Sequence, residues 1–413
     1  MNVVQVARRF AVNDWGGAET VILETSKQLL RTGHHTEILC TLATADNESD
    51  NVEGVSVRRV PYFYPYFGLS DDAKRLLDRK GGSPFSFAML NALRRYPDLD
   101  LIHLHTGNRL GGIGRYVARK RRIPYVVSLH GAKFDVPPEE AASWTAPAKG
   151  AIEWGKMLGW WVGSRRLLDD AAAILCVGHG DSVLAQQRFS EKRVVYLPNG
   201  VNAERFATGD GKGFRARYGI PANALVMLTV ARIDHQKNQH FIARVLPELV
   251  RIRPDVHALI VGHVTTETYY DALLDLITER NMRAHATVIQ GLPGASQELV
   301  DAYHAADLFV LPSNHEPFGI VVLEAWAAGL PVIASRVGGI PTFVEDGVDG
   351  MLFTPGDERA FLRGFSALLS GERGRALAMA GQRKAREEYS WERIAQRLIR
   401  IYQEAVRENP LRK

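Results

Sequence analysis

Two glutamates, Glu316 and Glu324, are the residues of this sequence that are best placed to do chemistry. They stand eight positions apart in the segment HEPFGIVVLEAWAAGLPVIASR, where a loop gives way to a helix. At about 1.5 Å of rise per helical residue, a loop carboxylate and one inside the helix lie roughly 10 Å apart. That spacing is too wide for two carboxylates that act on one bond. It suits the two ends of one elongated ligand.

The elements that position this pair can be predicted from the surrounding pattern. Phe318 and Gly319 mark the start of a helix over residues 320–328, and buried strands are expected at residues 308–311 and 332–334. The free N–H groups of the first helical turn lie between the two glutamates. They favour the binding of an anion such as a diphosphate.

Each glutamate also has a simpler interpretation. Glu316 is then an ordinary loop residue and Glu324 a solvated position on the helix. The neighbours of Glu324 are almost all apolar, so the helix has little polar face for a solvated charge. A carboxylate in so apolar a helix needs a partner.

The sequence EPFG at residues 316–319, followed by Glu324, resembles the signature of family 4 of the retaining glycosyltransferases, which have the GT-B fold. The resemblance implies that Glu316 lies beside the donor sugar and that Glu324 holds the nucleotide ribose. It also implies that backbone amides near the start of the helix meet the diphosphate.

Two cations, Arg232 and Lys237, follow the strand expected at residues 225–231. Such a pair is often no more than a solvated surface feature. The resemblance implies that they neutralise the donor diphosphate as the leaving group gains charge. The chain departs from the family pattern nearby, with Thr342 where a glutamate is common and His263 where an acidic residue is common.

The first half of the chain carries two further candidates. Gly16 and Gly17 follow a short strand at residues 2–7 and open a helix, so their backbone can approach a phosphate, although this is not the GxGxxG fingerprint. His130 follows the strand at residues 125–129, at the end where open α/β sheets bind ligands. A core histidine remains an alternative. The resemblance implies that the GGAE loop contacts the donor and that His130 lies near the reacting carbon of the sugar.

The resemblance extends to a hinge, PNGV at residues 198–201, and to a loop at Gly291-Leu292 that borders the nucleotide base. It implies catalytic roles for four residues: His130, Arg232, Lys237 and Glu316. It implies donor binding by a larger set: Gly16, Gly17, Asn199, Arg232, Lys237, Leu292, Glu316, Phe318, Gly319, Ile320 and Glu324.

Metal-binding patterns are present but weak. Asp98 and Asp100 form a DxD sequence, yet they directly precede a strand, where acidic residues commonly end a turn. His103, His105 and His130 have neither a HExxH spacing nor a nearby cysteine. We therefore expect no metal site and no cofactor apart from the nucleotide-sugar substrate.

With 413 residues, the chain exceeds what one hydrophobic core usually supports. Alternating strands and helices occur twice, which predicts an α/β protein with two Rossmann-like, doubly wound parallel sheets. The predicted domains are an acceptor-binding domain at residues 1–200, a donor-binding domain at 201–390 and a terminal helix at 391–413. The resemblance implies a GT-B arrangement, with the domains facing each other across a cleft and the last helix crossing back.

A cytoplasmic location is predicted. The sequence begins without the pattern of a secretory signal and contains no uncharged apolar run of about 18 residues. Cys40 and Cys176 each lie in an apolar strand-like run, so buried reduced thiols are expected.

The net charge of +5 lies entirely in residues 1–200, where 26 Lys and Arg face 21 Asp and Glu. The basic run at residues 119–122 suits a helix C-terminus. Together with Trp154, Trp160 and Trp161 it also suits peripheral contact with the anionic inner face of a membrane. The aromatic residues 62–67 fit a sugar site, a membrane interface or an irregular core loop.

The resemblance implies a retaining, metal-independent transferase that moves a hexose-type sugar from a UDP- or GDP-linked donor. The acceptor is a glycan, a lipid-linked molecule or a small molecule, and the expected setting is cell-surface polysaccharide or glycoconjugate biosynthesis. No residue is an evident covalent nucleophile, so front-face attack is inferred. The alternatives are a nucleotide-sugar 2-epimerase of the same fold and a noncatalytic sugar- or nucleotide-binding protein. Nucleic acid is not an expected partner.

Overall fold

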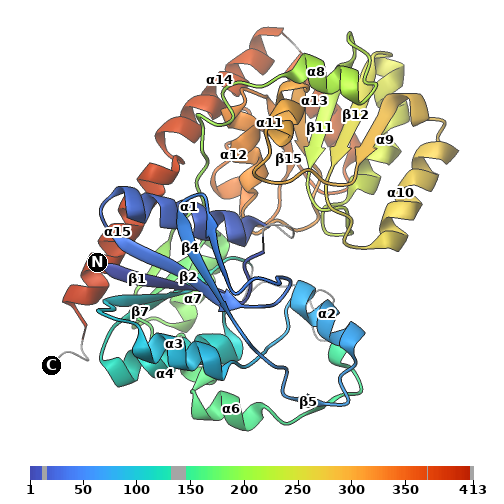
Figure 1. The fold of residues 1–413 in the computed structure, drawn as a ribbon. Helices are drawn as coiled ribbons and strands as arrows, with labels where there is room; N and C mark the ends of the chain where they lie inside the picture. Colours follow the sequence, from blue (N-terminus) through green and yellow to red (C-terminus); the bar gives the residue numbers. More distant parts are fainter. Residues whose placement is uncertain (12–15, 132–145, 370, 410–413) are drawn as a thin grey trace. The chain divides into compact units, whose positions relative to one another are not determined.

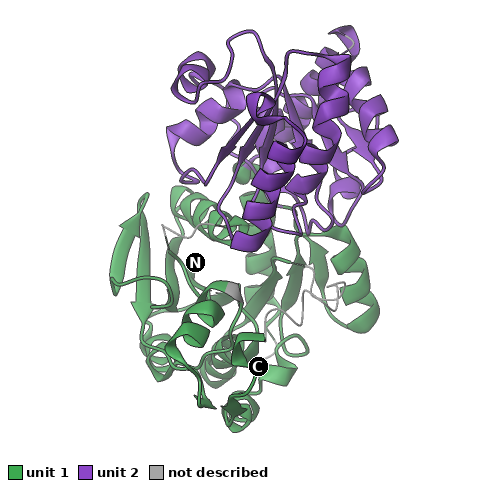
Figure 2. Cartoon of the chain, turned by 90° about the vertical axis from the view of Figure 1, so that its right-hand side faces the viewer, with its two compact units in different colours: residues 1–198, 391–413 green, residues 199–390 purple. Residues whose placement is uncertain are grey.

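The structure is a computed structural model that describes residues 1–11, 16–131, 146–369 and 371–409. It separates into two compact units. Unit 1 comprises Met1–Pro198 together with Trp391–Lys413, and unit 2 comprises Asn199–Ser390 (Figure 2).

In the described part of unit 1, eight strands form one sheet with the order β10-β9-β7-β6-β1-β2-β4-β3. Neighbouring strands are parallel except for β3, which runs antiparallel to β4 at the edge. The strands are β1 (Asn2–Val6), β2 (His35–Thr41), β3 (Ser49–Val52), β4 (Val55–Val60), β6 (Leu101–Leu104), β7 (Tyr125–Leu129), β9 (Ala173–Cys176) and β10 (Val194–Tyr196). A separate two-stranded sheet pairs β5 (Tyr66–Phe67) with β8 (Ile152–Glu153).

The central strands of this sheet are mostly apolar because both faces are covered. Every residue of β6, β7 and β9 is buried. The described residues of unit 1 form the helices α1 (Gly17–Arg31), α2 (Asp71–Lys80), α3 (Phe87–Arg95), α4 (Asn108–Arg121), α6 (Lys156–Trp161), α7 (His179–Arg188) and α15 (Trp391–Arg407). They also form two short 3₁₀ turns, Ala146–Ala148 and Ser164–Arg166.

The last helix, α15, belongs to unit 1 although it follows all of unit 2 in sequence. Its buried residues recur at helical spacing and include Trp391, Ile394, Leu398 and Tyr402. The helix lies beside α1 and β7 (Figure 1). Burial of this apolar stripe is what attaches the end of the chain to the first sheet.

Unit 2 contains a wholly parallel sheet, which the described residues build from six strands in the order β13-β12-β11-β14-β15-β16. The strands are β11 (Leu225–Val230), β12 (Val256–Val261), β13 (Ala286–Ile289), β14 (Leu308–Leu311), β15 (Val332–Ser335) and β16 (Met351–Phe353). The helices are α8 (Gly211–Arg217), α9 (Gln239–Ile252), α10 (Glu267–Glu279), α11 (Gln297–His304), α12 (Ile320–Ala327), α13 (Glu358–Leu369) and α14 (Gly371–Glu387), with 3₁₀ turns at Arg283–His285 and Ile340–Thr342. Helices lie on both sides of the strands (Figure 1).

Each sheet has a point at which the direction of winding reverses. In unit 2 the chain runs from β11 outward to β12 and β13, and then returns to place β14 on the other side of β11. In unit 1 the strand β1 lies between β2 and β6 in the same way. The carboxyl ends of the strands at such a point are where open α/β sheets bind ligands.

The predicted fold class is confirmed, with two doubly wound parallel-sheet units. The sequence analysis did not anticipate β3, β5, β8 and β16, which are short strands. Cys40 and Cys176 are buried free thiols, as expected, and burial raises the pKa of each to about 12. Among the helices formed by the described residues, none has the length and apolar character needed to cross a membrane.

Candidate active site

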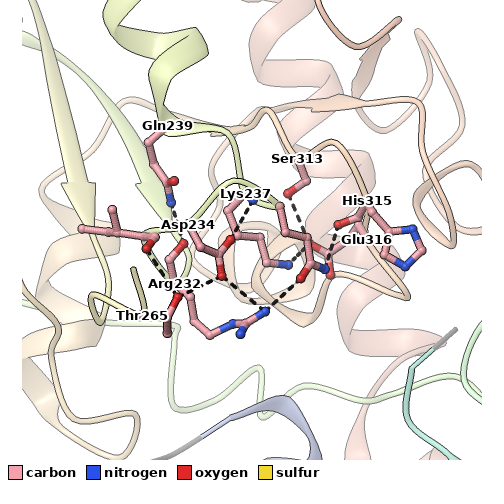
Figure 3. A network of polar contacts seen from close by, with 10 residues as sticks. Arg232, Asp234, Lys237, Gln239, Thr265, Ser313, His315 and Glu316 are labelled. Atoms are coloured by element: carbon pink, nitrogen blue, oxygen red, sulfur yellow. Dashed lines mark hydrogen bonds and ion pairs between the residues drawn. The ribbon is translucent and has the colours of Figure 1, made fainter. Parts of the chain in front are cut away.

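The centre of the candidate site is a contact between two side chains from different loops of unit 2. Lys237 lies in the loop after β11, and Glu316 lies in the loop after β14. The Lys237 Nζ is 2.6 Å from Glu316 Oε2, and both side chains are nearly buried (Figure 3). The hydroxyl of Ser313 lies 3.4 Å from the same carboxylate oxygen. The structure thus joins two predicted site residues at the switch point of the sheet.

The loop after β11 is held in shape by Asp234. Its Oδ1 accepts a hydrogen bond of 3.0 Å from the backbone N–H of Lys237, and its Oδ2 accepts one of 3.1 Å from the hydroxyl of Thr265. Arg232 Nη2 lies 3.5 Å from Asp234 Oδ2 and donates to Gln236 Oε1 at 3.0 Å (Figure 3). The Arg232 guanidinium is therefore oriented while about half of its side chain stays exposed.

Hydrogen bonds also join this loop to the loop that carries Glu316. Gln236 Nε2 donates to the carbonyl of His315 at 3.1 Å, and the backbone N–H of Asn314 donates to the carbonyl of Gln236 at 2.8 Å. Asn314 Nδ2 donates to the carbonyl of His235 at 3.0 Å. These bonds fix the position of Lys237 relative to Glu316.

A third loop, which follows β15, closes on the backbone of Glu316. Gly339 N–H donates to the Glu316 carbonyl at 2.9 Å. Gly338 has φ +51°, and a Cβ atom placed on it would lie 2.0 Å from the same carbonyl oxygen. Only glycine fits this close approach, because a side chain would collide with the backbone of Glu316.

Glu324 lies on α12, and its partner is the hydroxyl of Tyr303. Tyr303 Oη donates to Glu324 Oε2 at 2.7 Å, from a side chain that is fully buried. Burial raises the pKa of Glu324, whereas the hydrogen bond from Tyr303 and the charge of Arg205 oppose that rise. The Glu324 carboxylate was expected to have a partner, and that partner is the Tyr303 hydroxyl. The hydroxyl bonds one of the two carboxylate oxygens.

The residues between the two glutamates differ in what they can offer a ligand. The Phe318 ring is buried and stacks on Phe343 with centroids 4.7 Å apart, so a ligand can meet only the backbone of this residue. Gly319 has φ +98° and begins α12, where Ile320 is half-buried. The backbone amides of the first turn of α12 therefore remain candidate contacts for an anion.

Two other predicted donor contacts in unit 2 are largely buried. Leu292 follows β13 and the left-handed Gly291, and Asn199 is the first residue of the unit. Among the described residues, no hydrogen bond joins either of them to Lys237 or Glu316.

The remaining candidates, Gly16, Gly17 and His130, belong to unit 1. Gly16 precedes α1 in extended backbone, and Gly17 is the first residue of that helix. His130 follows β7 and forms a 2.6 Å hydrogen bond between its Nε2 and His105 Nδ1. His130 thus lies directly after the carboxyl end of β7, the end at which open α/β sheets bind ligands.

The DxD sequence, which was discounted as a metal site, and the basic run at residues 119–122 both contain side chains with hydrogen-bond partners. Asp100 Oδ2 accepts a 2.9 Å hydrogen bond from the backbone N–H of Asn2. In the basic run, Arg121 donates to the carbonyls of Leu93 and Tyr96 at 2.9 and 2.6 Å. Within the described ranges, no three His, Cys, Asp or Glu side chains are arranged to hold a metal ion.

Sequence reasoning missed the residues that orient the site, namely Asp234, Gln236, Thr265, Tyr303 and Gly338. Asp234 and Gln236 lie between Arg232 and Lys237, and this position in the sequence was the only indication that they belong to the site. Tyr303 comes from α11, and only the folded chain brings its hydroxyl to Glu324.

The histidines of unit 1 make the stability of the protein sensitive to acid. Burial lowers the pKa of His130 from 6.5 to about 4, and it holds the pKa values of His103 and His105 well below that of free histidine. Between pH 6.5 and 4 the unfolded chain therefore binds protons that the folded chain does not. The free energy of unfolding is largest above this window and falls as the pH drops through it.

We expect the melting temperature to fall between pH 6.5 and 4.5, measured by thermal unfolding in buffers of constant ionic strength. The melting temperature should fall less steeply with decreasing pH in His130→Asn, which removes one of the three buried histidines. An identical slope in the wild type and the variant would contradict this prediction.

Comparison with known proteins agrees with the geometry. Residues 16–200 match the model of the glycosyl transferase 4-like domain, and residues 212–402 match that of glycosyl transferases group 1. The chain is 31% identical over 407 residues to D-inositol 3-phosphate glycosyltransferase 1 of Catenulispora acidiphila, with 95% of this chain and 92% of the relative covered.

Solved structures of the same fold include sucrose-phosphate synthase from Thermosynechococcus elongatus, with a TM-score of 0.73 and 19% identity over 98% of this chain and 99% of that chain. Anabaena HepE in complex with UDP and glucose has a TM-score of 0.72 and 19% identity, with coverage of 98% and 99%. The chain therefore belongs to glycosyltransferase family 4, as an enzyme of the GT-B fold that takes its sugar from a nucleotide-sugar donor.

Proposed function

We propose that unit 2 binds a UDP- or GDP-linked hexose at the Lys237–Glu316 contact and that the enzyme transfers the sugar with retention of anomeric configuration. The observation that carries this proposal is the 2.6 Å ion pair at the switch point of the second sheet. Lys237 and the exposed guanidinium of Arg232 offer positive charge where the diphosphate would leave. Glu316 offers a carboxylate for sugar hydroxyls.

The proposed reaction is a front-face substitution. A hydroxyl oxygen of the acceptor attacks the anomeric carbon while the bond from that carbon to the diphosphate oxygen breaks. The nucleoside diphosphate leaves with the electron pair and accepts the proton of the attacking hydroxyl. Arg232, Lys237 and the amides of Phe318, Gly319 and Ile320 stabilise the growing negative charge.

The other predicted residues have supporting roles in this proposal. Glu324 holds the ribose with the carboxylate oxygen that Tyr303 does not engage, and Leu292 borders the base. Asn199, Gly16 and Gly17 complete the contacts with the donor. His130 contacts the transferred sugar, and unit 1 binds the acceptor.

A small hydroxylated molecule is the first acceptor to test. The relatives that cover nearly the whole chain are named D-inositol 3-phosphate glycosyltransferases. Their names support this class over the glycan and lipid-linked acceptors, and over a role in cell-surface polysaccharide synthesis. The identity of about 30% supports the class of acceptor and no single compound.

The test is a transfer assay with UDP-, GDP- and ADP-linked sugars, D-inositol 3-phosphate and a panel of other polyols, with EDTA present. We expect nucleoside diphosphate release that depends on the acceptor, and a product with the anomeric configuration of the donor by NMR. An inverted product would contradict retention. Isomerisation of the donor sugar without an acceptor would favour the 2-epimerase, and loss of activity in EDTA would contradict metal independence.

We also propose that unit 1 contacts an anionic membrane through an aromatic surface around β5, β8 and α6. This surface consists of exposed side chains that neighbour one another in sequence or in ring contacts: Phe67 (64% exposed), Ile152 (70%), Trp154, Met157 (79%), Trp160 (85%) and Trp161. Large exposed apolar patches commonly mark interaction sites. Tryptophan in particular favours the boundary between membrane and water.

The charged residues around the aromatic surface favour a negatively charged partner. The acidic residue of segment 146–166 is Glu153, which forms an ion pair with Arg109. The basic residues of the segment are exposed: Lys149, Lys156, Arg165 and Arg166. This balance favours anionic headgroups, each basic residue adding about 1 kcal/mol near such a surface.

We expect the protein to sediment with vesicles of phosphatidylcholine and phosphatidylglycerol, and less with phosphatidylcholine alone. Trp160→Ser should weaken this binding by about tenfold, because a large apolar side chain is lost from the interface. Met379→Ser is the matched control, since Met379 is 65% exposed on α14 of unit 2. Equal binding by both variants and the wild type would exclude the aromatic surface as the membrane contact.

A further inference from the structure

A chain of hydrogen bonds runs through the carboxyl ends of three neighbouring strands in unit 1. Gln5 lies in β1, His105 follows β6, and His130 follows β7. Gln5 Oε1 is 2.6 Å from His105 Nε2, and His105 Nδ1 is 2.6 Å from His130 Nε2. We call these three residues the histidine relay.

The Gln5 amide oxygen, the hydrogen-bond acceptor at the start of the relay, determines which ring nitrogens of His105 and His130 carry protons. An amide oxygen can only accept, so His105 must carry its proton on Nε2. The Nδ1 of neutral His105 is then a lone pair, and His130 must donate to it from its own Nε2. His130 is left with an unprotonated Nδ1, which is a hydrogen-bond acceptor; its bond to His105 uses the other ring nitrogen.

The environment keeps the relay neutral and its rings in place. Burial lowers the pKa of His130 to about 4, and His105 is held well below its usual pKa by burial and by its histidine neighbours. His103 lies with its ring centroid 3.9 Å from that of His105. It is itself fixed by 2.5 and 2.7 Å hydrogen bonds to Tyr402 Oη and Ser128 Oγ.

The orientation of the Gln5 amide decides the tautomers of the relay. Its Oε1 lies toward His105 Nε2, whereas its Nε2 is buried and has no hydrogen-bond partner among the described residues. The reverse orientation would reverse every proton and leave His130 with an N–H instead of a lone pair.

We propose that Gln5 and His105 are positioning residues that hold His130 in one neutral tautomer, whose Nδ1 accepts a hydrogen bond from a hydroxyl of the bound sugar. This inference rests on the proposed contact between His130 and the sugar. It assigns His130 to a neutral hydroxyl and not to the charged diphosphate, which would require an N–H donor or a cation.

The tautomers can be measured without any substrate. Two-bond ¹H–¹⁵N spectra of histidine-labelled full-length protein at pH 7.5 identify the protonated nitrogen of each ring. We expect Nε2–H for both His105 and His130 in the wild type and in Gln5→Glu, which keeps an acceptor. Gln5→Met, which is similar in size but has no acceptor, should give a mixture of tautomers for His130. Nδ1–H on His130 in the wild type would overturn the proposal.

Kinetics separate this positioning role from a structural one. Gln5→Met should lower kcat/KM roughly tenfold, as expected for one misdirected hydrogen bond to a neutral group. Gln5→Glu should retain most of the activity. Ser128→Ala removes a buried hydroxyl from His103 but leaves the relay intact, and it should keep the wild-type rate.

A double-mutant cycle gives the sharpest result. In the His130→Ala background, Gln5→Met should cause no further loss, because its effect acts only through His130. Additive losses would mean that Gln5 has only a structural role. If the wild type transferred no sugar, the proposed function would fail, whereas the NMR spectra would still decide the tautomer.

Discussion

Lys237→Met is expected to lower kcat for sugar transfer by about 10²- to 10³-fold, the usual cost of removing one group that stabilises a developing negative charge. Lys237 Nζ is 2.6 Å from Glu316 Oε2, so the ion pair holds the lysine in a defined position. The effect is read from acceptor-dependent release of nucleoside diphosphate at saturating donor.

The same substitution also affects folding, because it leaves the Glu316 carboxylate buried without its partner. Breaking such a pair costs about 3–5 kcal/mol. The double variant Lys237→Met/Glu316→Gln removes both charges and should recover much of the melting temperature. It should remain inactive, so that loss of stability is separated from loss of chemistry.

A matched control lies elsewhere in unit 2. Lys384 Nζ is 2.6 Å from the buried carboxylate of Asp349 and also bonds the carbonyl of Phe343 at 2.6 Å. Lys384→Met should lose stability to a similar degree and keep the wild-type kcat. Equal loss of kcat in Lys237→Met and Lys384→Met would mean that Lys237 has no special role in the reaction.

Gly338→Ala is expected to reduce both stability and activity, because the new Cβ would lie 2.0 Å from the Glu316 carbonyl oxygen. Either the loop after β15 or the Glu316 backbone must move. A displacement of about 1 Å at a reacting group can cost about 10²-fold in rate. We therefore expect kcat/KM to fall by about that factor, measured at a temperature where the variant is folded.

Gly356→Ala provides the comparison for this effect. Gly356 has φ +79°, and a Cβ atom at that position meets nothing within 4 Å. Gly356→Ala should cost only the free energy of placing an alanine in the left-handed conformation, about 1–2 kcal/mol, and should leave kcat/KM unchanged. If Gly338→Ala behaved like Gly356→Ala, the close approach to Glu316 would have no part in catalysis.

Much of the fold could be predicted because its signals are local. Strands such as β7 and β9 are short apolar runs between helices, and their alternation determines a parallel α/β unit. The missed strands are short and polar or lie at an edge. Ser49–Val52 is mostly exposed, and Met351–Phe353 pairs only with β15. Such segments depend on a neighbouring strand more than on their own sequence.

The site was predictable where the residue itself would meet the ligand. Lys237 and Glu316 stand 79 positions apart, and their contact follows from the adjacency of β11 and β14 in the sheet. The residues that support the site were not predictable from their own positions, because Tyr303 acts on Glu324 and Gly338 on Glu316 through contacts that only the fold supplies. A tyrosine in an amphipathic helix and a glycine after a strand are common features with no chemical signal of their own.

The measurement that tests the central claim most directly is the effect of nucleoside diphosphates on the melting temperature. UDP, GDP and ADP are titrated into the wild type, Lys237→Met and Lys384→Met in EDTA. A ligand that binds only the folded state raises the melting temperature, and the stabilisation grows with the logarithm of its concentration divided by its Kd. We expect one nucleotide to stabilise the wild type and Lys384→Met and to have little effect on Lys237→Met. An equal shift in all three proteins, or no shift with any nucleotide, would contradict the assignment of the donor site to Lys237 and Glu316.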